Sequence, residues 1–518
     1  MSRAIFKSTS VVGLTTLLSR ITGMMRDVAQ AQLFGGGPVA DAFLVAYKIP
    51  NFLRRLFAEG AFSQSFVPVV SQYKHQNSQA EVKELISGAA GTLGLALFVI
   101  TVLGVIGAPL IIWAFAPGFT QDGGRYDLAV EMLRLTFPYL FFISLTALGS
   151  GVLNSYGSFG PPAFTQVLMN LIMIVAAVWI APHFANPGLV LAVSVFISGV
   201  VQVAFQVPFL LKLKLLGWPR WRWDHAGVRK VATLMVPGIL GSSMAQVSLL
   251  LDTQIASFLA TGSVTLMYFA DRLVEFPLGV FSIALATVIL PSLSGHHAAE
   301  APERFSSTLD WALKLVVIMV LPAAVALFVL AGPLTATFFG HGRFNPHDVT
   351  MSSYALMAYS FGLLGFSFVK VLAPGYFARQ DTRTPVRVSL VSLGVNIGIN
   401  VLVVAPLVYF KVLPAPHAFL ALSTGISACV NSALLYRGLR RRDILKPSAG
   451  WGALLGRVIF ASLAMAALLW WLAGDLPSWF AMHTWQRVMH TGICVLAGGA
   501  VYFTALYAVG MRPRHVRH

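Results

Sequence analysis

Residues 91–112 read GTLGLALFVITVLGVIGAPLII and contain no charged side chain. A helix needs roughly 20 predominantly apolar residues to cross the hydrocarbon core of a bilayer, so this stretch predicts a membrane-spanning helix. The rest of the chain has the same character, because 57% of its 518 residues are hydrophobic and only 11% are charged. A soluble domain carries about 25% charged residues. The sequence therefore predicts an all-α, polytopic membrane protein.

The same length criterion predicts about fourteen spans along the chain. They are centred near residues 20, 45, 100, 140, 172, 198, 246, 280, 322, 362, 396, 424, 462 and 498. The first two fit the pattern least well, because both carry charged residues.

The basic residues of the loops predict an orientation. If the N-terminus is cytoplasmic, the outer loops carry only Arg125, Arg343 and Lys411, and the other basic loop residues fall on the inner side. Enrichment of Lys and Arg in cytoplasmic loops sets topology, so we expect both termini in the cytoplasm. The net charge of +17 is therefore spread between apolar runs. A nucleic-acid-binding protein would gather it into one patch, so we expect no nucleic-acid partner.

A faint internal repeat divides the chain. VPVVS at 67–71 matches LPSLS at 290–294, and Pro162 and Pro385 lie the same distance apart as Pro68 and Pro291. Two lobes of six helices in the same orientation are known in several transporter folds, with the binding site between the lobes near the midplane. We expect an N-terminal lobe at 1–215 (helices 1–6), a C-terminal lobe at 216–445 (helices 7–12), and two additional helices with a basic tail at 446–518.

Charged and polar residues interrupt the early helices of each predicted lobe. A charge at the bilayer centre costs roughly 2.5–3.5 kcal/mol on insertion scales, so such residues usually line a polar interior. The cations outnumber the acids here, and arginine binds phosphate through a planar fork. We expect them to bind an anion. The residues are Ser19, Arg20, Arg26, Asp27, Asp41, Lys48, Arg54, Arg55, Asp271, Arg272 and Glu275.

Each ion pair within this set has an alternative, purely structural interpretation. Arg26 can pair with Asp27 or Asp41, and Arg272 with Asp271 or with Glu275, which lies at i+3 on the same helical face.

The stretch PNFLRRLFAEGAFSQSFVP at 50–68 is unusually polar for this chain. One interpretation places Arg54 and Arg55 at the mouth of a cavity at the inner end of the second helix. Gly60 then relaxes the chain after Glu59, and Ser63, Gln64 and Ser65 offer hydrogen bonds. The alternative is a solvated collar whose arginines touch anionic lipid headgroups. Residue patterns alone do not separate the two.

Four blocks of sequence closely resemble the MurJ (MviN) family of bacterial lipid II flippases. They are SRITGMMRD, DAFLVAYKIPNFLRRLFAEGAFSQSFVP, YFADRLVEFPLGVFSIALATVILPSLS and VLAPGYFARQDTRTPVR. The family belongs to the multidrug/oligosaccharidyl-lipid/polysaccharide exporter superfamily. The resemblance implies two six-helix lobes plus two C-terminal helices, in a multi-pass protein of the bacterial cytoplasmic membrane. It also implies that those two helices form a groove for a lipid tail.

The resemblance further implies a substrate and a site. The substrate is lipid II, an undecaprenyl-pyrophosphate-linked peptidoglycan precursor, which moves from the inner to the outer leaflet by alternating access. The family's cavity arginines fall on Arg20, Arg26, Arg54 and Arg272, its acids on Asp41 and Glu275, and its serine on Ser19. We add Lys48 and Arg55 as further cations. The expected partners are lipid II, membrane lipids and, as a further possibility, cell-wall synthesis proteins.

The driving force stays open at this point. Some relatives hold a cation, and Asp252, Asn396, Asn400 and Thr424 are candidate Na⁺ ligands here; the membrane potential is the other candidate. We expect no catalytic residue and no other cofactor.

The sequence leaves three other functions as alternatives. An exporter of organic cations would need a net negative cavity, which the arginine excess argues against. A flippase for another polyprenyl-linked glycan would carry the same cations. A membrane scaffold that recruits cell-wall enzymes without transport would leave the arginines dispensable.

Overall fold

A computed structural model describes residues 3–55, 62–122, 124–410 and 413–512, and side chains are described for these except residues 3–12, 63, 64, 122, 236–249 and 409. The described residues are helical and contain no strand, which confirms the predicted all-α class. Internal contacts divide the chain into two compact units, Met1–Val264 and Thr265–His518. Each unit is described by itself below.

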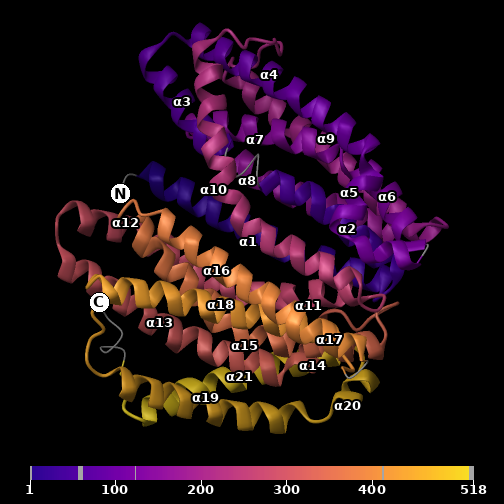
Figure 1. Ribbon diagram of the computed structural model, residues 1–518, viewed down its shortest axis with the longest axis vertical. Helices are drawn as coiled ribbons and strands as arrows, with labels where there is room; N and C mark the ends of the chain where they lie inside the picture. The colour runs from indigo at the N-terminus through magenta and orange to yellow at the C-terminus, as the bar shows by residue number, and fades with distance from the viewer. Residues whose placement is uncertain (1–2, 56–61, 123, 411–412, 513–518) are drawn as a thin grey trace. The chain divides into compact units, whose positions relative to one another are not determined.

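The first unit contains ten α-helices among its described residues (Figure 1). They are α1 Arg3–Phe34, α2 Pro38–Arg54, α3 Ser63–Gln76, α4 Gln79–Ile106, α5 Ala108–Phe115, α6 Gly124–Thr136, α7 Tyr139–Ser155, α8 Gly160–Val175, α9 Pro187–Lys212 and α10 Ala226–Ser257. α1 packs on α8 and α2 packs on α6, so residues distant in sequence face each other inside this unit.

The second unit starts within α11. Its helices are α11 Ser263–Pro277, α12 Ala284–Ala298, α13 Pro302–Val329, α14 Ala331–Phe338, α15 Pro346–Phe377, α16 Arg383–Ile399, α17 Ala405–Tyr409, α18 Pro416–Arg441, α19 Trp451–Ala473, α20 Leu476–Ala481 and α21 Thr484–Ala508. The π-helical turns Leu278–Ile283 and Asn400–Val404 join α11 to α12 and α16 to α17. α15 lies between α13 and α18, and α19 packs on α13 and α21.

Eleven helical stretches among the described residues are long and apolar enough to cross a membrane. They contain the predicted span centres from residue 100 onward, except the one near residue 246. The remaining three centres, near 20, 45 and 246, lie within α1, α2 and α10. Each predicted centre is therefore helical, whereas the exact count of fourteen spans stays a prediction.

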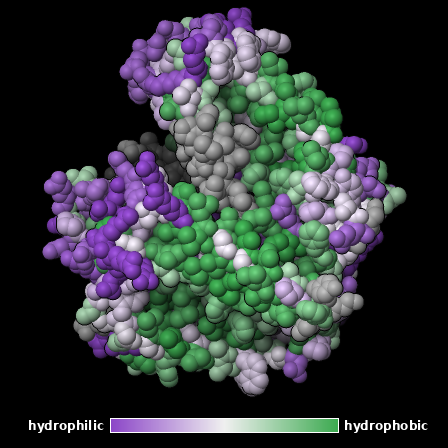
Figure 2. All heavy atoms as spheres, in the orientation of Figure 1, coloured by the Kyte–Doolittle hydropathy of each residue, from purple (hydrophilic) through white to green (hydrophobic). Residues whose placement is uncertain are grey.

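The surface of these helices suits lipid. Exposed side chains on α4 include Phe98, Leu103 and Ile106, and those on α21 include Leu496 and Phe503. Figure 2 shows a broad hydrophobic area on the second unit and a hydrophilic cap at the end of the first unit where α3 and α4 lie. Apolar residues facing outward are expected where the surrounding solvent is a bilayer.

The division into units differs from the predicted lobes at one helix. α10 packs on α3, α4 and α5, so it groups with the first unit, whereas the repeat places it at the start of the second lobe. Packing and repeat symmetry are different criteria, so the lobe boundaries stay predictions. In the polar stretch at 50–68, Glu59 and Gly60 lie outside the described residues, as do the side chains of Ser63 and Gln64.

Small residues bring α15 and α18 together. A Cβ added to Gly362 would collide with the Cα of Gly425, and one added to Gly365 would lie 2.7 Å from the backbone nitrogen of Cys429. Close backbone approach through small residues is the usual way in which helices associate in lipid, because the hydrophobic effect offers little there.

We expect Gly362→Ala to lower the thermal stability of the purified protein, since overpacking costs about 1–3 kcal/mol. Gly398→Ala on α16 is the matched control, because a Cβ there meets nothing within 4 Å. Thermal unfolding in detergent measures both. Equal midpoints for the two variants would show that the α15–α18 contact is not as tight as described.

An ionic cap fixes the start of α16. The Asp381 carboxylate accepts hydrogen bonds from the Thr384 backbone N–H (2.9 Å), the Thr384 hydroxyl (2.6 Å) and Arg442 Nη1 (2.8 Å). Partial burial raises the pKa of Asp381, but the hydrogen bonds from Thr384 and Arg442 and the Arg442 charge outweigh it and lower the pKa to about 2. The ionised form is therefore the one that the fold stabilises.

Because the folded pKa lies below the ordinary value, Asp381 stabilises the protein above about pH 4 and loses that contribution as the pH falls toward 2. The pair with Arg442 is partly exposed, so we expect at most about 1 kcal/mol. The thermal midpoint of Asp381→Asn should lie below that of the parent protein at pH 6, and the gap should narrow below pH 4. Asp475→Asn is the control, because that side chain makes no capping hydrogen bond. A gap that stays constant with pH would contradict this account.

Candidate functional site

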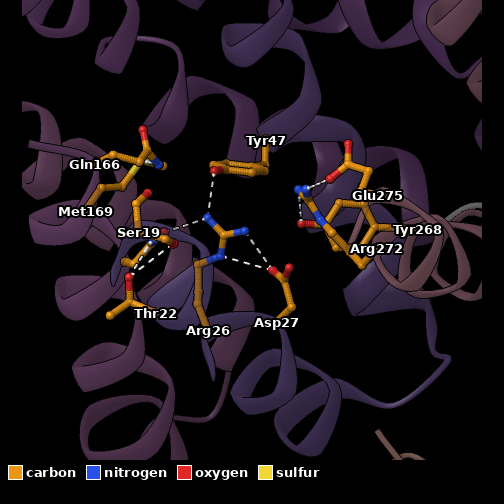
Figure 3. A network of polar contacts seen from close by, with 11 residues as sticks. Ser19, Thr22, Arg26, Asp27, Tyr47, Gln166, Met169, Tyr268, Arg272 and Glu275 are labelled. Carbon is orange, nitrogen blue, oxygen red and sulfur yellow. Dashed lines mark hydrogen bonds and ion pairs between the residues drawn. The ribbon is translucent and has the colours of Figure 1, made fainter. Parts of the chain in front are cut away.

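Arg26 is the centre of a buried polar network in the first unit (Figure 3). Its Nη2 and Nε donate to Asp27 Oδ1 at 2.7 and 3.0 Å. Its Nη1 donates to the Asn170 side-chain oxygen at 3.0 Å and to the Tyr47 hydroxyl at 3.4 Å. One guanidinium therefore links α1 to α2 and α8, and its charge is balanced by the neighbouring carboxylate.

Asn170 closes this network back onto α1. Its side-chain nitrogen donates to the Ser19 carbonyl and to the Thr22 hydroxyl, both at 3.1 Å. Ser19 therefore takes part through its backbone, whereas the resemblance implied a role for the residue without saying which atom. Gly23 permits this approach, because a Cβ there would lie 3.6 Å from the Asn170 side-chain nitrogen.

Asp41 pairs with an arginine that the sequence analysis did not connect to it. Arg125 Nη1 lies 3.3 Å from Asp41 Oδ2, and both side chains are buried. Asp41 Oδ2 also accepts the Gly262 N–H at 2.7 Å, and the Arg125 guanidinium stacks 4.7 Å over the Phe119 ring. We assigned Arg125 to an outer loop; it lies instead in α6, in a buried ion pair.

The other predicted cations of the first unit differ in exposure. Lys48 is half-buried and donates to the Thr253 hydroxyl at 3.4 Å. Arg54 is half-buried and donates from Nε to the Asn51 oxygen at 3.1 Å. Arg20 and Arg55 are exposed, and neither has an ion-pair partner among the described residues.

Arg272 forms a similar trio in the second unit, drawn in Figure 3. Its Nη1 donates to Glu275 Oε2 at 2.6 Å and its Nη2 to the Tyr268 hydroxyl at 2.9 Å, with the guanidinium 4.7 Å over the Tyr268 ring. The predicted i, i+3 pairing with Glu275 is confirmed. This pair is open to its surroundings, because the side chains of Arg272 and Glu275 are 25% and 44% exposed.

These contacts favour the structural interpretation of individual pairs without removing the excess of positive charge. Each of the three acids Asp27, Asp41 and Glu275 already has an arginine partner. Asp41 pairs with Arg125, which is not one of the predicted site cations. Asp41 therefore offsets less of the positive charge of the predicted site cations than the sequence suggests. The exposed Arg20 and Arg55 stay as uncompensated cations in the described part of the chain.

Three of the predicted Na⁺ ligands lie together in the second unit. The Asn396 side chain donates to the Thr424 hydroxyl at 3.2 Å, and Asn400 donates to the Asn396 oxygen at 2.9 Å. The Asn400 oxygen in turn accepts the Ser423 hydroxyl at 2.6 Å. Both amide oxygens are thus hydrogen-bond acceptors in a neutral network. The fourth candidate, Asp252, is buried in the first unit.

Asn396, Asn400 and Thr424 supply neutral oxygens, which suit Na⁺ when a carboxylate joins them. The described residues hold no group of three or more His, Cys, Asp or Glu side chains that could bind a metal ion. The Na⁺ site stays a prediction.

Sequence reasoning missed Tyr47, Asn170, Tyr268 and Arg125. Tyr268 lies four residues before Arg272 on the same helical face, so its spacing was a usable signal. Asn170 lies 144 residues from Arg26 and Arg125 lies 84 from Asp41, so only the packing of α8 and α6 reveals these contacts.

Comparison with known proteins gives a consistent result. A family model described as "Lipid II flippase MurJ" matches residues 30–490. The chain is 42% identical over 520 residues to the lipid II flippase MurJ of Burkholderia cenocepacia, covering 99% of each protein. It is 41% identical over 514 residues to the probable lipid II flippase MurJ of Haemophilus influenzae, covering 97% of this chain and 99% of that protein.

Solved structures show the same fold. A lipid II flippase MurJ in an inward closed conformation matches with a TM-score of 0.78 at 23% identity, covering 95% of this chain and 97% of that one. An inward-facing MATE-family multidrug resistance transporter of the MOP superfamily matches with a TM-score of 0.65 at 15% identity, covering 81% and 94%.

We expect Arg125→Ala to destabilise the protein by up to about 3–5 kcal/mol, because it removes a buried cation that pairs with the Asp41 carboxylate. The double variant Asp41→Asn with Arg125→Ala should lose less than the sum of the two single changes. Chemical unfolding in detergent measures the three variants. Asp127→Asn, an exposed acid on the same helix, is the control. Additive losses would show that the two residues do not act as a pair.

Proposed function

The chain belongs to the MurJ family of lipid II flippases, and we propose that it carries lipid II from the inner to the outer leaflet of the bacterial inner membrane. Family membership over nearly the whole chain supports this substrate, and the many apolar helices agree with a multi-pass membrane protein. A transporter of this class moves its cargo without making or breaking a covalent bond. The contacts of the arginines suggest how this chain handles the cargo's pyrophosphate.

The observation that carries the mechanism is the partly exposed Arg272–Glu275 pair, which the buried Tyr268 supports. A carboxylate bears one charge and a pyrophosphate bears more, so a pyrophosphate competes well for the same planar fork. Glu275 is nearly half exposed and can move aside when the anion arrives. The Tyr268 hydroxyl, on the neighbouring turn of α11, holds the other Nη nitrogen and keeps the fork oriented.

Arg26 has a different role in this proposal. Its side chain is buried and is engaged by Asp27, Asn170 and Tyr47, so its first task is to hold α1 against α2 and α8. Direct contact with the pyrophosphate requires the Asp27 pair to open. We propose that this opening belongs to the transport cycle, and that the exposed Arg20, six residues earlier on α1, contacts the anion first.

Transport is proposed to follow alternating access, with the polar headgroup shielded by protein and the prenyl tail in lipid. A ligand shifts a conformational equilibrium only if it binds one state more tightly, and an anion that relieves repulsion between cations meets this condition. We propose the membrane potential as the driving force, since it contributes about 2.3 kcal/mol per charge per 100 mV.

We also propose that both termini lie in the cytoplasm and that the chain binds cell-wall synthesis proteins. We further propose that α19 and α21 form a groove for the prenyl tail of the substrate. The exposed apolar side chains of α19 and α21, among them Leu463 and Leu496, suit a prenyl chain as they suit any lipid.

Arg272→Ala should reduce lipid II flipping by about tenfold or more, since a charge-assisted hydrogen bond contributes about 1.5–3 kcal/mol. Arg272→Lys should keep part of the activity, because the charge stays but the fork is lost. Flipping is measured with lipid II in proteoliposomes, and survival is measured in a strain depleted of its own flippase. Arg379→Ala is the control, because Arg379 is exposed and lies between α15 and α16.

The outcomes separate the alternatives. Normal flipping by Arg272→Ala would contradict the proposed role of the arginine. Normal survival with Arg272→Ala, combined with no transport by the parent protein in proteoliposomes, would favour a scaffold. Flipping of a different polyprenyl-pyrophosphate glycan, with lipid II left unmoved, would identify the cargo as that glycan.

A further inference from the structure

The segment between α9 and α10 carries a dense alternation of tryptophan and arginine that transport does not use. Residues 217–225 read GWPRWRWDH, with lysines at 212 and 214 before them. We propose that this segment, called here the Trp–Arg segment, binds the headgroups of anionic phospholipids in the leaflet that it faces. All of its contacts lie within the first unit.

The backbone of the Trp–Arg segment is fixed on α4. The Arg220 N–H donates to the Ser87 carbonyl at 3.1 Å, and the Arg222 N–H donates to the Thr92 hydroxyl at 3.2 Å. Gly88 and Gly91 leave room for it, since a Cβ at Gly91 would collide with the Arg220 backbone. The segment therefore lies in a groove of small residues on α4, and two backbone hydrogen bonds fix its position there.

The turn that starts the segment is also well defined. α9 ends at Lys212 and is followed by Lys214 at a φ of 57°, and the N–H groups of Lys214 and Leu215 donate to the carbonyls of Leu211 and Leu210. This is the usual pattern of a helix that ends in a left-handed residue. At the other end, His225 caps α10 by accepting the Gly227 N–H at 3.1 Å.

The tryptophans point away from α4. Trp218 is 84% exposed and Trp221 is 58% exposed, and Trp221 and Trp223 stack with ring centroids 6.4 Å apart. Arg222, between these two residues in the chain, pairs with Glu84 of α4 at 2.9 Å. The segment therefore presents an exposed aromatic face and is tied to α4 by an ion pair.

The position along α4 places this aromatic face at the membrane boundary. Leu95 lies seven residues after Gly88 and four residues after Gly91, so the three residues share one face of α4. It is exposed, as are Phe98 and the apolar residues that follow, whereas the preceding turns carry the polar Glu81, Lys83 and Glu84. Thr92 is about 4.5 Å from Leu95 along the axis. Indole rings prefer this interfacial level.

The charge around the Trp–Arg segment selects the kind of headgroup. Arg222 engages both nearby acids, Glu84 at 2.9 Å and Asp224 at 3.3 Å. Arg220 is exposed and has no ion-pair partner among the described residues. Further exposed basic side chains lie on the segment's flanks in sequence, at Lys212, Lys214, Arg229 and Lys230, and Lys83 of α4 lies beside Gly217. A basic cluster beside interfacial tryptophans complements an anionic phosphodiester better than a zwitterionic headgroup, whose own cation would be repelled.

Bromine-quenching of tryptophan fluorescence tests this proposal on the full chain in nanodiscs. The discs contain phosphatidylcholine with a fixed fraction of either dibrominated phosphatidylglycerol or dibrominated phosphatidylcholine. The signal of the Trp–Arg segment is the difference between the parent protein and the variant Trp218→Phe/Trp221→Phe/Trp223→Phe, so the other tryptophans cancel. We expect this signal to be quenched more strongly by the brominated phosphatidylglycerol.

Arg220→Ala should reduce the preference for phosphatidylglycerol by about fivefold, which is the effect of one basic residue near an anionic surface. Arg220→Glu should reduce it further, and the exposed Arg379→Ala should leave it unchanged. Equal quenching by the two lipids would show a tryptophan anchor without headgroup selection and would overturn the proposal. It would also be overturned by absence of quenching, or by an unchanged preference in both Arg220 variants. None of these readouts depends on lipid II transport.

Discussion

The free-energy cost of placing a charge in low-dielectric surroundings is the main constraint on this structure. Each buried charge must have a partner, because a lone ion in such surroundings costs several kcal/mol. The first unit meets this requirement twice, with Arg26 beside Asp27 and with Arg125 beside Asp41. The Arg125–Asp41 pair also joins α6 to α2. Arg26 reaches α2 and α8 through its hydrogen bonds to Tyr47 and Asn170. The buried arginines therefore contribute directly to how the helices of that unit pack.

Exposure distinguishes the pairs that build the fold from the pair that can exchange partners. Arg26 and Arg125 are almost fully buried, and losing either partner would remove a buried ionic contact from the charge that remains. Arg272 and Glu275 are partly exposed, so the carboxylate can leave and another anion can replace it. In both units a tyrosine hydroxyl holds the guanidinium beside its carboxylate, Tyr47 in one and Tyr268 in the other. A similar set of side chains thus has a structural role when buried and is suited to binding when accessible.

Sequence patterns predict what depends on neighbouring residues along the chain. The apolar runs predict the helices, and the i, i+3 spacing predicts the Arg272–Glu275 pair. The partners of Arg26 and Asp41 depend instead on how α8 and α6 pack, and no local pattern encodes that. Arg125 shows the same limit, because a basic residue between two apolar runs looks like a loop residue until its carboxylate partner on α2 is known. The Gly362–Gly425 contact also joins positions that periodicity alone does not connect.

In the proposed mechanism, Glu275 occupies the place on Arg272 that the substrate pyrophosphate takes. The most direct test is the affinity of detergent-solubilised protein for undecaprenyl pyrophosphate, compared between the parent chain and Glu275→Gln. Removing the competing carboxylate charge should tighten binding in Glu275→Gln, and this gain should disappear when Arg272→Ala is added. Weaker or unchanged binding in Glu275→Gln would contradict the account, because it would mean that the carboxylate does not compete with the anion for the guanidinium.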